Sequence, residues 1–211
     1  MPSLQTPTNI DTYFIVGSYI FSFLVGGVLA LSTHIKKLFN KKVEIGSLPP
    51  NFVRLHTVLD EYLTEMRVNL NASRTSISKF HNGGHFFDGE SILKFTTTNE
   101  SCSLGINNTI ESSQGLLITR WIGIVGVLQE EGTNLHYTKD IVDNQLRGYY
   151  EARNTVAFIT KSTICSKGLK TGFISVEWCE YEDIENQSTK NTLNLFEYYT
   201  RIINSTINIS K

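Results

Sequence analysis

The sequence predicts an α+β protein in which one transmembrane helix precedes an antiparallel sheet flanked by helices. Three observations support this prediction. Residues 13–35 contain no Asp, Glu, Lys or Arg and are mostly apolar. The rest of the chain gives helix and strand patterns in the order helix, two strands, irregular middle, two strands, helix. The composition, with 40% hydrophobic and 18% charged residues among 211, is that of a globular chain with one sizeable core.

The uncharged segment predicts a membrane anchor. Residues 1–12 form a short N-terminal segment, residues 13–35 are long enough as a helix to cross roughly 30 Å of hydrocarbon, and residues 36–50 form a basic linker. Lys36, Lys37, Lys41 and Lys42 follow the span, whereas no Lys or Arg precedes it. Because cytoplasmic flanks carry the excess of cations, we expect a single-pass membrane protein whose soluble domain faces the cytoplasm. The missing basic residues before the span also disfavour a cleaved signal peptide.

Small residues recur along one stripe of the predicted span. Ser18, Ser22, Gly26 and Ala30 are four residues apart, so their side chains share one helix face on which two spans could approach closely. This stripe predicts a homodimer or higher oligomer. The alternative is that small residues are simply common in membrane helices.

Residues 51–211 are expected to form the soluble domain. Apolar residues at steps of three and four predict a helix over residues 51–71. Strands are expected at residues 74–80 and 91–98, part of residues 113–131 is expected to be helical, and residues 188–207 give a closing helix. β-Branched and aromatic runs at residues 155–165 and 171–178 flank a glycine-containing turn and predict a hairpin. We expect the helices to pack on one face of the antiparallel sheet.

This order of elements resembles the GAF family. The stretch from Gly172 to Trp178, followed by an acidic turn and a closing helix, is similar to the end of that family's fold. The resemblance covers residues 51–209 and implies a sensory or interaction module that binds a small molecule or a signalling protein. The Asn-Lys and Phe-x3-Asp-Glu pattern of members that bind cyclic nucleotides is absent, which argues against that ligand.

The segment from Lys79 to Gly89 is the most distinctive stretch of the chain. Glycines permit close approach of a ligand, histidines titrate near neutral pH, and phenylalanines could cover an apolar ring. The predicted ligand-binding residues are His81, Asn82, Gly83, Gly84, His85, Phe86 and Asp88. The alternative is a β-turn whose polar side chains cap their own backbone.

Other chemistries find little support in the sequence. Cys102, Cys165 and Cys179 show no Cys-x-x-Cys spacing, and the sequence offers no third ligand to join His81 and His85 on a metal. There is no Gly-x-Ser-x-Gly elbow and no phosphate loop, so we expect neither an enzyme nor a bound cofactor. With a net charge of −1 and scattered cations, nucleic acid is not an expected partner.

Two functions therefore compete. The first is a membrane-anchored GAF-like module that binds a small ligand or protein partner at the cytoplasmic face. The second follows from chain length and the single N-terminal span, which also resemble the holins of T-even-type phages. Such proteins oligomerise in the inner membrane and place their soluble domain in the periplasm, so topology separates the two.

Overall fold

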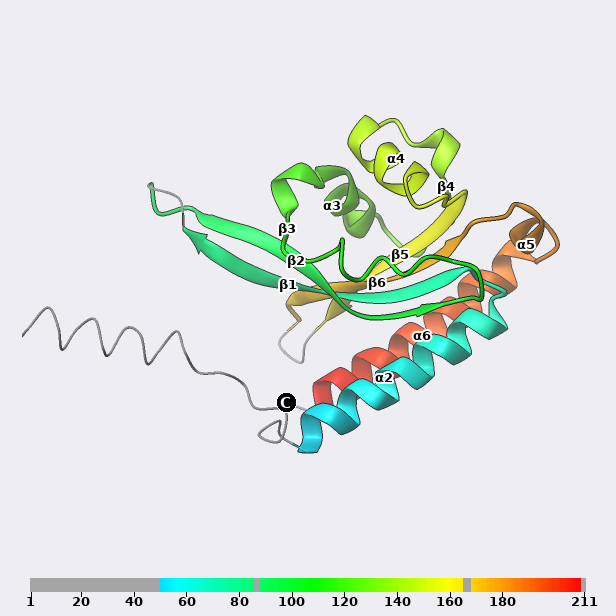
Figure 1. Ribbon diagram of the computed structural model, residues 1–211, viewed down its shortest axis with the longest axis horizontal. Coiled ribbons are helices and arrows are strands. Elements are labelled where there is room, and N and C mark those ends of the chain that lie inside the picture. Colours follow the sequence, from blue (N-terminus) through cyan, green and yellow to red (C-terminus); the bar gives the residue numbers. More distant parts are fainter. Residues whose placement is uncertain (1–49, 86–87, 165–167, 210–211) are drawn as a thin grey trace, which may run out of the picture. The chain divides into compact units, whose positions relative to one another are not determined.

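The computed structural model describes residues 50–85, 88–164 and 168–209 (Figure 1). The predicted span at residues 13–35, with its stripe of Ser18, Ser22, Gly26 and Ala30, lies outside the described residues, as do Phe86 and Cys165. Across the three described ranges, no helix has both the length and the apolar character needed to cross a membrane.

A six-stranded antiparallel sheet forms the centre of the domain, with the order β3-β2-β1-β6-β5-β4. Its strands are β1 (Arg74–His85), β2 (Ser91–Cys102), β3 (Leu116–Leu117), β4 (His136–Tyr137), β5 (Ala157–Ile164) and β6 (Lys170–Trp178). The four strands expected from the sequence are confirmed, and β1 and β2 extend farther than expected. The two short outer strands, β3 and β4, are too brief to leave an alternating pattern in the sequence.

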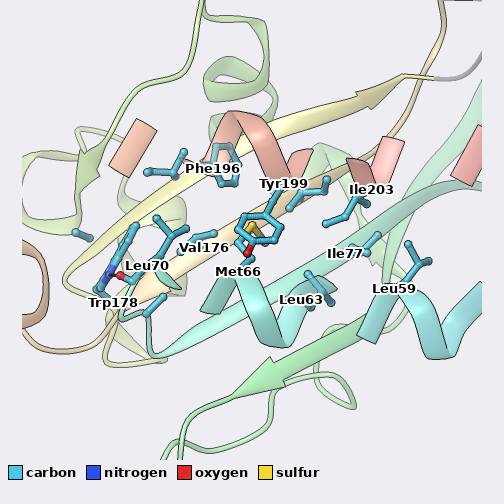
Figure 2. Close-up of a cluster of buried hydrophobic side chains, with 14 of the residues drawn as sticks. Leu59, Leu63, Met66, Leu70, Ile77, Val176, Trp178, Phe196, Tyr199 and Ile203 are labelled. Carbon is cyan, nitrogen blue, oxygen red and sulfur yellow. Dashed lines mark hydrogen bonds between the residues drawn. The ribbon is translucent and has the colours of Figure 1, made fainter. Parts of the chain in front are cut away.

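One face of the sheet is covered by the two long helices, α2 (Pro50–Asn69) and α6 (Thr189–Ile209). Both helices were expected, and their apolar stripes pack onto β1, β5 and β6 (Figure 2). The fully buried core residues here include Leu59, Leu63, Met66, Leu70, Ile77, Ile174, Val176, Trp178, Phe196 and Ile203. The indole N–H of Trp178 donates to the Leu70 carbonyl over 3.1 Å, which ties the end of α2 to β6.

The opposite face is covered as well, which corrects the expectation that helices pack on one face only. Two short helices, α3 (Ile122–Gln129) and α4 (Asn144–Glu151), lie there (Figure 1). The cause lies in β5 and β6, where Phe158 and Phe173 point to this face and their neighbours Ile159 and Ile174 to the other. Strands that are apolar on both faces need cover on both. A fifth described helix, α5 (Glu182–Glu185), links β6 to α6.

The outer edge of β2 is closed partly by a strand and partly by a loop. β3 pairs with β2 only at Lys94 and Phe95. Farther along, the Thr97 amide donates to the Ser113 carbonyl over 3.0 Å, and the Gln114 side-chain amide donates to the Thr97 carbonyl over 2.9 Å. The loop of residues 103–115 thus occupies an edge that would otherwise remain open.

Candidate functional site

Four charged side chains are buried together on the face of the sheet that carries α3 and α4. Arg74 of β1 and Glu177 of β6 are register partners, and their Nη1 and Oε2 atoms lie 2.6 Å apart. Arg153, just after α4, contacts both Glu177 oxygens, at 2.8 Å through Nη2 and 3.1 Å through Nε. Glu100 of β2 completes the group, 3.4 Å from Arg74 Nε and 3.9 Å from Arg153 Nη2. We call Arg74, Glu100, Arg153 and Glu177 the buried quartet.

The charges of the buried quartet balance one another. Side-chain exposure is 2% for Arg74, 0% for Glu100, 8% for Arg153 and 3% for Glu177. Burial by itself raises the pKa of Glu177, but Arg153 and Arg74 outweigh that effect, so the pKa lies below its usual value. Burial likewise opposes the charge on Arg153, yet Glu177 more than compensates and the pKa of Arg153 is raised. The pKa shifts of Glu177 and Arg153 thus both favour the charged form of the pair that they make.

Glu100 anchors the loop of residues 103–115 to the sheet. Its carboxylate accepts from the Thr109 and Ile110 amides at 2.8 and 3.0 Å, and from the Thr109 hydroxyl at 2.6 Å. Arg74 adds a bond from Nη2 to the Asn107 carbonyl at 2.9 Å. Because charge-assisted bonds of this kind are shorter and stronger than neutral ones, the quartet fixes both the loop and the end of α4.

A cleft of about 600 Å³ opens between that loop and α4. Its walls are Thr109, Ser112, Leu116, Arg120, Trp121, Asn144, Gln145, Gly148, Tyr149, Ala152 and Arg153, and we call it the α4 cleft. The rings of Trp121 and Tyr149 meet edge to face with centroids 4.7 Å apart. The Arg153 guanidinium lies over the Tyr149 ring at 4.7 Å, so the buried quartet supports one wall of the cleft.

The polar groups around the α4 cleft differ in their availability. Arg153 is already paired with Glu177, whereas Arg120 is exposed and forms no ion pair with any residue that the structure describes. Asn144, Gln145 and Thr109 offer amide and hydroxyl groups at the walls. A flat aromatic molecule with an anionic substituent would match these aromatic rings, amides and exposed cation.

The surface of the sheet beneath α3 and α4 is filled by aromatic side chains. Tyr150 stacks on Phe158 with ring centroids 3.8 Å apart, and Phe95 meets Phe173 at 5.2 Å. A ligand therefore finds open volume beside α4 and not directly against these rings. A second cavity, of about 380 Å³, lies between α3 and α4 and has Gly126, Glu130, His136 and Asp143 among its walls.

The predicted ligand-binding segment lies elsewhere, on the projecting hairpin of β1 and β2 (Figure 1). His81 to His85 and Asp88 are exposed, and neither of the two cavities above is lined by them. Asn82 Oδ1 accepts from the Gly84 amide over 2.9 Å, as in the capping interpretation. Three neighbouring side chains also make hydrogen bonds within the hairpin: His81 with Thr96, His85 with Ser91, and Asp88 with the Glu90 amide.

Cys102 and Cys179 are free thiols at the ends of β2 and β6. Burial raises the pKa of both, which keeps them protonated and weakly nucleophilic. Among the described residues, no three His, Cys, Asp or Glu side chains are grouped as a metal ion would require.

Neither the quartet nor the α4 cleft was predicted from the sequence. A signal was present for the quartet, because Arg74 and Glu177 stand within predicted strands, where charged residues are unusual unless paired. The sequence signal for the cleft was weaker. Asp143 is the N-cap of α4 and accepts from the Leu146 amide at 2.6 Å, but the helix that follows has only eight residues.

Comparison with known proteins gives structural matches only. No protein-family model matches the chain, and no curated protein matches it in sequence. The phycoerythrobilin-bound GAF domain of a cyanobacterial phytochrome has a TM-score of 0.56 at 13% identity, over 74% of this chain and 86% of that one. A phycocyanobilin-bound GAF domain, also from a cyanobacterial phytochrome, has the same TM-score at 15% identity, over 74% and 85%. The GAF domain region of a Geobacter sulfurreducens protein gives 0.51 at 14%, over 74% and 95%.

These similarities concern the fold. The three GAF domains have folds similar to that of this chain, so the expected GAF-like α+β architecture is confirmed for the described part of the chain.

Proposed function

We propose that this protein is a membrane-anchored sensory module whose GAF-like domain binds a small ligand in the α4 cleft. The observation that carries the proposal is the cleft itself, where Trp121, Tyr149 and Arg120 surround an open volume beside a buried charge network. The bilin-bound GAF domains with the same fold support a small molecule as the occupant. The walls favour a planar aromatic ligand with an anionic group that Arg120 would bind.

A glycine at the cleft wall provides the test. A Cβ built on Gly148 meets no atom within 4 Å, so the side chain of Gly148→Leu can start from open space at the cleft wall and occupy part of the cleft. Gly126 is equally open but lines the second cavity, which makes Gly126→Leu the matched control. The full chain would be melted in the presence of a panel of planar aromatic carboxylates and phosphates, with biliverdin as the largest member.

Binding to the folded state raises the melting temperature by mass action. We expect at least one compound to stabilise the wild type and Gly126→Leu but not Gly148→Leu. Equal stabilisation of Gly148→Leu, or no stabilisation by any compound, would contradict the α4 cleft as the ligand site.

The membrane part of the proposal comes from the sequence. A span at residues 13–35 followed by four lysines supports a single-pass protein with its GAF-like domain in the cytoplasm. A sensor with no output domain in the described part of the chain would pass its signal to a separate protein. The exposed residues 81–85 and 88 of the β1–β2 hairpin are a candidate contact for it. The holin alternative requires a periplasmic domain, so topology decides between them.

We further propose a parallel homodimer. The stripe of Ser18, Ser22, Gly26 and Ala30 supports contact between spans, and tethering to one bilayer raises the effective concentration of the partner. Val68 of α2 and Tyr198 of α6 are 61% and 53% exposed, which leaves apolar surface on the two long helices for a second copy. Single cysteines placed along the stripe should crosslink on mild oxidation in membranes, and failure at every position would contradict dimerisation through the span.

A further inference from the structure

One end of the domain combines three segments that are distant in the sequence. These are the start of α2 at residues 50–59, the ends of β5 and β6 that face each other at residues 162–164 and 168–173, and the end of α6 at residues 201–209. The helices α2 and α6 pack side by side in opposite directions, with the start of α2 beside the end of α6 (Figure 1). Ile164 is tied to α6 through its amide, which donates to Asn204, and its carbonyl, which accepts from Asn208 over 3.0 Å.

Large apolar side chains are exposed at this end. Phe52 is 47% exposed, Val53 53%, Ile164 44%, Leu169 63% and Ile209 86%. They come from all three segments, so this surface exists only in the folded domain and does not belong to one helix. We call these five residues the apolar end.

The charges of the same three segments have one sign. None of the 20 Asp and Glu residues falls within residues 50–59, 162–164, 168–173 or 201–209, whereas Arg54 and Arg201 do. Lys170 also lies there, with its ammonium group donating to the Leu128 carbonyl over 2.7 Å. The other end of the two long helices is acidic, with Glu180, Glu182, Asp183 and Glu185 close to the end of α2, where Asn71 donates to Asp183 over 2.8 Å. The domain is therefore polarised along α2 and α6.

We propose that the apolar end is a lipid-binding surface that contacts anionic phospholipid headgroups and inserts its apolar side chains among them. Interfacial surfaces of this kind combine exposed apolar residues with cations and lack carboxylates. The length of chain before α2 favours lipid as the occupant. If residues 13–35 span the bilayer, residues 36–49 hold the start of α2 within roughly 50 Å of the membrane even when fully extended.

The inference rests on the membrane anchoring proposed above, and the two are tested by separate readouts. The full chain, with Cys102, Cys165 and Cys179 replaced by Ser, would be reconstituted in vesicles of phosphatidylcholine with phosphatidylglycerol. Alkaline extraction reports on the anchor. A fluorophore on Leu169→Cys or Ile209→Cys reports on the apolar end, and the same fluorophore on Leu104→Cys or Val142→Cys provides matched exposed controls.

Brominated phospholipids quench fluorophores that lie among the lipids. We expect loss of fluorescence at positions 169 and 209 and unchanged fluorescence at 104 and 142. Arg54→Glu should weaken the quenching at 169 and 209, whereas Lys190→Glu, at the opposite end of α6, should not. Exchange of phosphatidylglycerol for phosphatidylcholine should act like Arg54→Glu, because the attraction is electrostatic.

The outcomes are distinct. A chain that resists extraction but shows equal quenching at all four positions overturns the lipid surface and leaves the anchor intact. A chain that is extracted by alkali overturns the anchor, whatever the fluorophores show. Fluorophores at 169 and 209 that are shielded from water but not quenched by brominated lipid would mean that a second copy covers the apolar end, which also overturns the proposal.

Discussion

Replacing Glu177 with glutamine tests whether the buried quartet stabilises the fold. The glutamine retains the shape but removes the charge that faces Arg74 and Arg153, and its amide group would point at least one donor toward guanidinium donors. Glu100 would then be the one remaining anion of the quartet. Removal of one partner from a buried ion pair costs about 3–5 kcal/mol. For a domain of this size that corresponds to a decrease in melting temperature of roughly 6–20 °C.

The assay is thermal and urea unfolding of the full chain in detergent micelles, with tryptophan fluorescence as the signal that reports unfolding. Trp178 is fully buried and reports on the core between the sheet and the long helices. The control is Glu151→Gln, because the Glu151 side chain is 62% exposed and lies 3.7 Å from Arg147. An exposed pair of this kind contributes about 0.5 kcal/mol. If Glu177→Gln cost no more than this control, the quartet would not be a source of stability.

The pH dependence gives an independent check on the same residue. The pKa of Glu177 is lower in the folded than in the unfolded state, so its stabilising contribution is complete above the unfolded pKa. It is lost as the pH falls through the folded pKa. Wild-type protein should therefore lose stability on acidification more steeply than Glu177→Gln. Parallel pH profiles would contradict the assigned pairing.

Three further predictions address the fold, the topology and the hairpin. Gly172→Ala should destabilise by about 1–3 kcal/mol or more in urea unfolding, because the added Cβ would lie 2.0 Å from the Ser78 carbonyl oxygen; unchanged stability would contradict the close approach of β1 and β6. Protease added outside intact spheroplasts should leave residues beyond 51 uncut, since the lysines predict a cytoplasmic domain, and complete digestion would favour the holin alternative. Replacing exposed His81 and Asn82 together with Ala should alter binding of a partner protein with little loss of melting temperature, whereas unfolding would show that the turn serves the fold.

The sequence was informative where one pattern extended over many residues. The long helices α2 and α6 were predictable because apolar residues recur at steps of three and four, and the strands β5 and β6 because β-branched and aromatic residues are concentrated in them. The element α4 was not, since eight residues with Leu146 and Tyr150 as buried positions give too few turns to establish a period. Helices on the second face could have been inferred from Phe158 and Phe173, which alternate with aliphatic residues that face the other way.

The candidate site was harder to predict than the fold. Arg74, Glu100, Arg153 and Glu177 are separated by long stretches of chain and come together only through the antiparallel register of β1, β2 and β6. His81, Asn82 and Asp88 are close together in the sequence, yet their hydrogen bonds in the structure are local to the hairpin. The spacing of residues along the chain thus gave little information on a site that depends on tertiary contacts.

The loop of residues 103–115 has a consequence for the behaviour of the protein at high concentration. An unpaired strand edge is a template for pairing with another chain, and β3 covers β2 at only two residues. The loop supplies Ser113 and Gln114 to satisfy the backbone of Thr97, and Glu100 of the quartet holds the loop in place. Any change that releases the loop would therefore expose β2 to edge-to-edge aggregation between molecules. If the proposed span confines the protein to a membrane, copies would meet often, and this loop would then limit aggregation of the domain.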